Sequence, residues 1–129
     1  MDKAKLMDVH ILARRMYRLL SEVDDLSRQL AEAVDRNDQV SAEMLMSMRE
    51  APIRQLVNTK EDILRQLDTA SAEDARRLRQ LLNGEEPREE EEKGLAAQAA
   101  SNTKLLRQVQ ALDEVLNRKI TRDDSIYAK

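Results

Sequence analysis

The chain has 129 residues, of which 36% are charged and 2% aromatic, and glycine and proline occur twice each. So few turn-forming residues, beside many Leu, Ala, Glu and Arg, are typical of long helices and leave little room for a sheet. The net charge of −3 argues against a nucleic-acid partner. The lack of cysteine excludes disulfides and thiolate metal sites. No apolar run resembles a signal peptide or a membrane span. We therefore expect a single all-α domain in a cytoplasmic protein.

The first predicted helix runs from the N-terminus to near Asn37 and Asp38, where the apolar period breaks. Residues spaced alternately three and four apart form a seam along it: Leu6, Val9, Ala13, Met16, Leu20, Val23, Ser27, Leu30 and Val34. A second row, spaced by seven, flanks this seam: Leu12, Leu19, Leu26 and Ala33. An apolar face of this width predicts that the first helix packs against two neighbours.

A second helix is expected over residues 39–67, with a kink or phase shift at Pro52, which has no amide hydrogen to donate. Its second half carries an apolar seam: Ile53, Leu56, Lys60, Ile63 and Leu67. Its first half places Met44, Met46 and Met48 within five residues, and flexible methionine side chains suit a surface that accepts varied helical partners. Because Met44 and Met48 are four apart, core packing is the preferred interpretation for them and a partner surface is the alternative.

A short third helix is expected over residues 72–82, with Ser71 as its N-cap and Asn83 and Gly84 at its end. The glutamate-rich segment EEPREEEEKG follows, and we interpret it as a solvated helix start with Pro87 in the first turn rather than as a cation site. Two groups of arginines are likewise interpreted as solvated helix faces: Arg14, Arg15 and Arg18, and Arg76, Arg77 and Arg79.

The last helix is predicted over residues 87–121, weakened near its start by Gly94 by about 1 kcal/mol relative to alanine. Its seam consists of Leu95, Ala99, Asn102, Leu106, Val109, Leu116 and Ile120, with Leu105 and Leu112 beside it. The predicted fold is an elongated antiparallel bundle of three long helices plus one short helix over residues 1–120, with a short C-terminal tail over residues 121–129.

No pattern of residues predicts catalysis, a cofactor or a metal site. His10 is the single histidine and has no glutamate three residues before it, so the Glu-x-x-His pairs of di-iron bundles are absent from the sequence. We interpret His10 as a boundary residue of the first helix. Glycine-rich phosphate-binding loops are also absent, and adjacent aspartates diverge on a helix. We therefore expect a protein that is not an enzyme.

The stretch SNTKLLRQVQALDEVLNRKITRDDSIYAK, residues 101–129, resembles the C-terminal region of FlgN-type flagellar export chaperones. Asn102 precedes the Leu105–Leu106 pair, a long amphipathic run follows, and Ile126 and Tyr127 come after a polar break. The resemblance implies a cytosolic chaperone that keeps hook-filament junction proteins unassembled, binds their amphipathic helical ends and docks on the cytoplasmic domain of the export gate.

Two sets of site residues follow from this interpretation. The expected client groove consists of Leu105, Leu106, Val109, Leu112 and Leu116, with Met44, Met46 and Met48 as further candidates. In the FlgN family a tyrosine in the tail is implicated in docking to the gate; Tyr127, with Ile126 beside it, matches that position, and the alternative is that both fold back onto the bundle. Two other functions stay open: a coiled-coil tethering protein that homo-oligomerises through the first-helix seam, and a related chaperone for the filament cap protein.

Overall fold

The computed structural model describes the backbone of residues 1–127 and the side chains of residues 1–121. Residues 1–127 form helices and no strand, which confirms the all-α prediction. The long helices are α1 (Lys3–Asp35), α2 (Gln39–Asp68) and α4 (Lys93–Tyr127); the short elements are α3 (Ala72–Leu82) and the 3-10 turn η1 (Glu90–Glu92). α2 continues through Pro52 as one helix.

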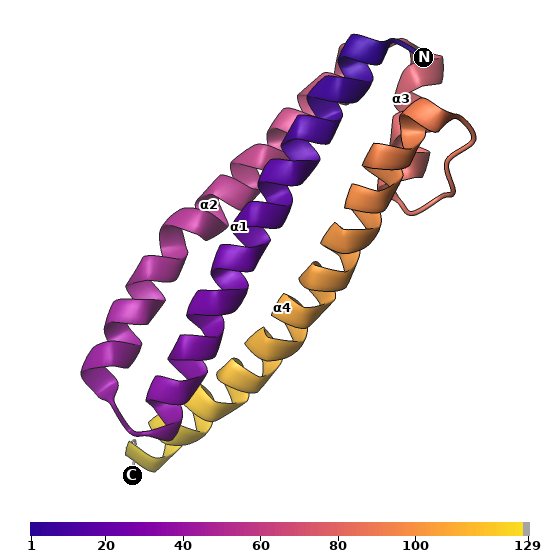
Figure 1. The fold of residues 1–129 in the computed structure, drawn as a ribbon. Helices are drawn as coiled ribbons and strands as arrows, with labels where there is room; N and C mark the ends of the chain where they lie inside the picture. The colour runs from indigo at the N-terminus through magenta and orange to yellow at the C-terminus, as the bar shows by residue number, and fades with distance from the viewer. Residues whose placement is uncertain (128–129) are drawn as a thin grey trace.

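Helix α1 lies in the middle of an elongated bundle, with α2 antiparallel along one side and α4 parallel along the other (Figure 1). The contacts of α1 with both neighbours extend along the molecule, whereas α3 covers only the end that holds the N-terminus, where it packs on α2 and α4. The wide apolar face of α1 therefore packs against two helices, as the sequence predicted.

The core forms three clusters along the bundle axis, and α1 contributes to all of them. The cluster at the α3 end contains Leu6, Val9, Leu12, Ala13, Ile63, Leu67, Leu78, Leu81 and Leu95. The middle cluster contains Leu20, Val23 and Val109, and the far cluster contains Leu26, Leu30, Ala33, Leu45 and Leu116. The predicted flanking row of α1 is fully buried, as is its predicted seam except for the half-buried Met16 and Val34.

The ends of the first three helices follow from local capping. Asp38 accepts a hydrogen bond from the Ser41 amide (3.1 Å), and Ser71 accepts one from the Asp74 amide (3.1 Å). Asn37 and Gly84 have positive φ angles of 57° and 96°, which end α1 and α3 with residue types that tolerate this conformation. These boundaries agree with the predicted ones to within a residue or two.

Both ends of α4 differ from the prediction. Its backbone stays helical past Thr121 to Tyr127 and so includes most of the predicted C-terminal tail. Pro87 lies in the connection before η1, and α4 begins only at Lys93. A Cβ atom on Gly94 would lie 2.8 Å from Cε1 of the half-buried His10, so the missing side chain lets α4 approach α1 closely at this point. Farther along, the buried Asn102 side chain donates from Nδ2 to the Ala13 carbonyl (2.9 Å). Glycine and asparagine thus fix how α4 lies on α1.

Candidate partner-binding surface

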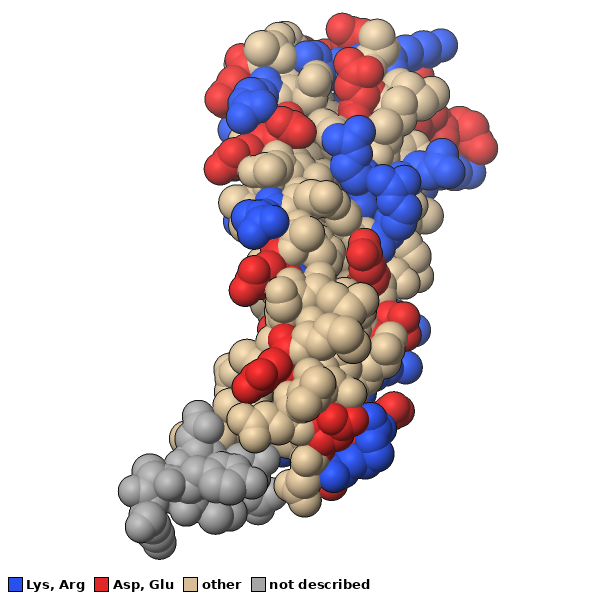
Figure 2. Space-filling model, turned by 90° about the vertical axis from the view of Figure 1, so that its left-hand side faces the viewer, with Lys and Arg blue, Asp and Glu red and all other residues tan. Residues whose placement is uncertain are grey.

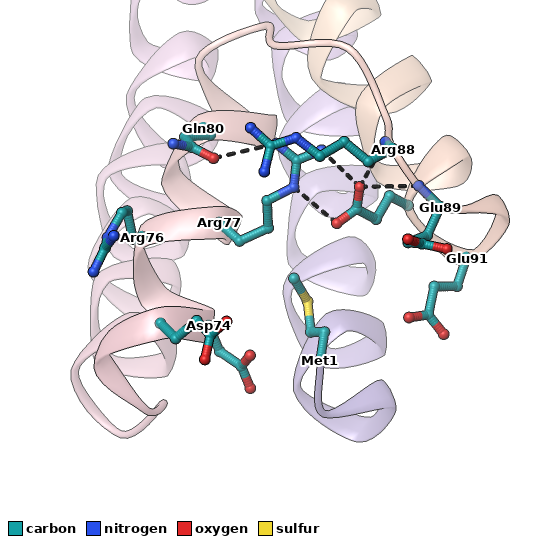
Figure 3. A pocket seen from close by; sticks show the side chains of 10 residues that line it. Met1, Asp74, Arg76, Arg77, Gln80, Arg88, Glu89 and Glu91 are labelled. Atoms are coloured by element: carbon teal, nitrogen blue, oxygen red, sulfur yellow. Dashed lines mark hydrogen bonds and ion pairs between the residues drawn. The ribbon is translucent and has the colours of Figure 1, made fainter.

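A polar depression of about 450 Å³ lies between α3, the segment that precedes α4, and the N-terminus (Figure 3). At its base Arg77 donates from Nε to Glu92 Oε2 (2.8 Å) and from Nη2 to Glu92 Oε1 (2.6 Å). The backbone amides of Arg88 (2.8 Å) and Glu89 (3.4 Å) donate to the same carboxylate. The hydrogen bonds from Arg77 lower the pKa of Glu92 to about 2, against the opposing effect of burial.

This ion pair corrects two predictions. Arg77 does not belong to a solvated face, and the glutamate-rich segment is not solvated throughout, because Glu92 is buried and bonded to Arg77. The remaining lining carries charges of both signs, including Asp74, Arg76 and Glu89. Among the described residues no group of histidine, cysteine and carboxylate side chains could hold a metal ion. We interpret the depression as a structural feature, in which the Arg77–Glu92 ion pair joins α3 to the segment that precedes α4.

The three clustered methionines of α2 are exposed: Met44 by 56%, Met46 by 46% and Met48 by 50%. The core interpretation of Met44 and Met48 is therefore wrong. The buried positions of α2 form a narrow row that these methionines do not join: Leu45, Pro52, Thr59, Ile63 and Leu67. Figure 2 shows the side of the molecule on which α2 lies, and uncharged side chains make up much of its lower half, where α2 begins.

The exposed methionines lie on two flanks of α2. Val40, Met44 and Met48 follow one another at intervals of four, so they share a flank, which we call the methionine row. Met46 is two residues from Met44 and from Met48, which places it about 200° around the helix from each. All three side chains of the methionine row are exposed, and their spacing of four places them about one turn apart along the first turns of α2.

The candidate groove residues of α4 are divided between the core and the surface. Val109 and Leu116 are buried in the bundle's own core, and Leu105 and Leu112 pack half-buried against it. Leu106, which the sequence placed on the seam, is 42% exposed. Only Leu106 of this set is open to a partner. Ile126 and Tyr127 end the backbone of α4, and their side chains lie outside the described part of the structure.

Three further apolar residues in the second half of α2 are exposed, which the sequence pattern did not predict: Ile53, Val57 and Leu64. Ile53 was assigned to the core seam because its spacing from Leu56 and Ile63 fits a helical period. On α1, Ile11 and Tyr17 are also exposed beside Arg14, Arg15 and Arg18, which are solvated as predicted. The helical spacing of apolar residues thus predicts which of them share a face of α2. It does not predict which face packs against another helix.

No family model, curated protein or solved structure matches this chain. No comparison therefore supports the resemblance to FlgN-type chaperones, which rests on the pattern of residues 101–129. Within residues 1–127, no helix combines the length and the apolar character that crossing a bilayer requires. The exposed apolar flanks of α2 and the exposed Leu106 are among the features of the described surface that point to a binding partner.

Proposed function

We propose that this protein is a cytoplasmic export chaperone of the FlgN type, which holds the amphipathic C-terminal helix of a hook-filament junction protein and delivers it to the flagellar export gate. The observation that carries the proposal is the methionine row, in which Val40, Met44 and Met48 present apolar side chains to solvent on one flank of a long helix. The all-α fold and the resemblance over residues 101–129 support the same function.

The chemistry of the row suits an unfolded client. An amphipathic segment can bury its apolar side only against another apolar surface, and it becomes helical as it binds. From Val40 to Met48 the row is about 12 Å long, which matches roughly two turns of a docked helix. Methionine side chains adjust their shape, so they accept different apolar residues of the client. A contact of this size, which also has to order the client, is expected to bind in the micromolar range.

The proposal is tested by titrating C-terminal fragments of hook-filament junction proteins into the purified protein in a calorimeter. We expect a one-to-one complex that is weakened at least tenfold by the double substitution Met44→Gln and Met48→Gln. Met7→Gln is the matched control, because Met7 is an equally exposed methionine on α1. Absence of binding by the wild type, or equal binding by the double variant, would reject this client site.

The tail supplies a separate test. Ile126 and Tyr127 remain the candidate residues for docking on the export gate, and a variant that lacks residues 123–129 should keep its affinity for the client fragment and lose its affinity for the cytoplasmic domain of the gate. If the deletion abolishes client binding instead, the tail belongs to the client site.

The two other functions are less well supported. A tethering protein that oligomerises through the first-helix seam would need that seam on its surface, whereas α2 and α4 bury it. A chaperone for the filament cap protein would use the same surface, and a fragment of that protein in the same titration separates the two clients.

A further inference from the structure

The second apolar flank of α2 has the spacing of a coiled-coil seam. Its residues follow one another at intervals of four, three, four, three and four, and we call them the α2 seam: Met46, Glu50, Ile53, Val57, Lys60 and Leu64. All six are exposed. Among the described residues neither Glu50 nor Lys60 makes an ion pair.

The α2 seam is symmetric about Gln55. Met46 and Leu64 are equally far from this residue, and so are Ile53 and Val57, and Glu50 and Lys60. A second α2 running in the opposite direction would therefore place apolar residues against apolar residues and Glu50 against Lys60 at both ends of the contact. A parallel second helix would place Glu50 against Glu50 and Lys60 against Lys60, which is unfavourable.

We propose that two copies of this chain associate through their α2 seams, antiparallel, about a two-fold axis at the level of Gln55. The occupant is a second copy because the seam complements itself in both charge and apolar character, as an isologous two-fold interface requires. The dimer uses residues on the flank of α2 opposite the methionine row, so it goes beyond the proposed chaperone function and does not depend on it.

Leu106 adds an apolar contact near the centre of this interface. Arg49 of α2 pairs with Asp113 of α4 (2.6 Å), which fixes the level of one helix against the other. Because the two helices are antiparallel, moving seven residues from this pair brings Leu106 level with Leu56, next to the proposed two-fold axis. Leu106 and Asp113 share a side of α4, and that side faces α2. The exposed Leu106 of each copy therefore lies beside the middle of the α2 seam.

The size of the contact sets its strength. From Met46 to Leu64 the seam is about 27 Å long, and one pair of helices in contact over this length buries less area than a stable dimer interface. We expect a monomer-dimer equilibrium with a micromolar dissociation constant. The exposed Glu50–Lys60 pairs contribute little net affinity but set the orientation, so the association should weaken when both become like-charge pairs.

Sedimentation equilibrium of the full chain tests the dimer without any client. Glu50→Lys alone and Lys60→Glu alone should each raise the dissociation constant about tenfold, because each puts like charges together at both ends. An equimolar mixture of these two variants should associate about as well as the wild type, and so should the double variant that carries both changes. Glu32→Lys on α1 controls for net charge, and circular dichroism checks that each variant is folded.

The antiparallel orientation of the two α2 helices is tested by disulfide crosslinking. The sequence has no cysteine, so only the introduced cysteines can react. Under oxidation, a mixture of Met46→Cys and Leu64→Cys chains should form a disulfide between the two variants, whereas each variant alone should remain reduced. A monomeric wild type, single charge variants that dimerise as well as the wild type, or a disulfide in Met46→Cys alone would each overturn the antiparallel dimer. Since no client is present, these outcomes leave the client titration unaffected.

Discussion

Glu92 accepts more hydrogen bonds than any other carboxylate among the described residues. It receives hydrogen bonds from two nitrogens of Arg77 and from two backbone amides, and it is nearly inaccessible to solvent. Glu92→Gln removes the charge but keeps the shape, so we expect the free energy of unfolding at neutral pH to fall by about 2 kcal/mol. Glu91→Gln, at an exposed neighbour, should change it by less than about 0.5 kcal/mol in the same urea titration.

The same carboxylate predicts a dependence on pH. Its pKa is lowered from 4.5 to about 2, so its contribution to stability is present above pH 4.5 and is lost as the pH falls from there toward 2. The wild type should therefore lose its stability advantage over the Glu92→Gln variant across this range. Urea midpoints of both proteins measured at several pH values check this, and parallel curves for the two would contradict it.

Unlike Glu92, the buried Ser27 has a side-chain polar group that makes no hydrogen bond within the described part of the structure. Its Oγ has no hydrogen-bond partner among the described residues, although its side chain is fully buried. Ser27→Ala should raise the free energy of unfolding by about 1 kcal/mol more than Ser21→Ala does. Ser21 is exposed on the same helix, so this control carries the same gain in helix propensity. A destabilised Ser27→Ala variant would show that the hydroxyl is hydrogen-bonded in solution.

The ends of the helices depend on single residues. Gly84 has a φ of 96°, and a Cβ at this position would meet nothing within 4 Å, so the cost of a side chain there comes from the backbone alone. Gly84→Ala should lower the free energy of unfolding by about 1 kcal/mol. Gly84→Asn should cost clearly less, since asparagine tolerates positive φ. Equal losses in urea denaturation would mean that backbone conformation is not the cause.

The helix ends also show how much of the fold the sequence predicts. The ends of α1, α2 and α3 were predicted closely because their caps involve residues within a few positions of each other. The start of α4 was missed because it depends on Glu92 meeting Arg77, fifteen residues away, and no local rule gives that contact. Met44 and Met48 were misjudged for a related reason: a helical period gives the spacing of apolar residues but not which flank has a neighbour.

The central position of α1 explains why α2 has exposed apolar side chains. α1 lies between α2 and α4 and buries its own face on both sides, whereas α2 has extensive contact only with α1. Two flanks of α2 are therefore left with exposed apolar residues, the methionine row on one and the α2 seam on the other. The two proposals assign one partner to each flank.

This assignment predicts that the two surfaces act independently. The double variant Met44→Gln and Met48→Gln should weaken client binding at least tenfold and change the dimer dissociation constant by less than about twofold, since the substituted side chains do not contact the seam. Glu50→Lys should raise the dimer dissociation constant about tenfold and change the affinity for the client by less than about twofold. Calorimetry with the client fragment and sedimentation equilibrium without it give both constants for each variant. If either variant weakens both associations, client and second copy share one surface, and binding of the client should then dissociate the dimer.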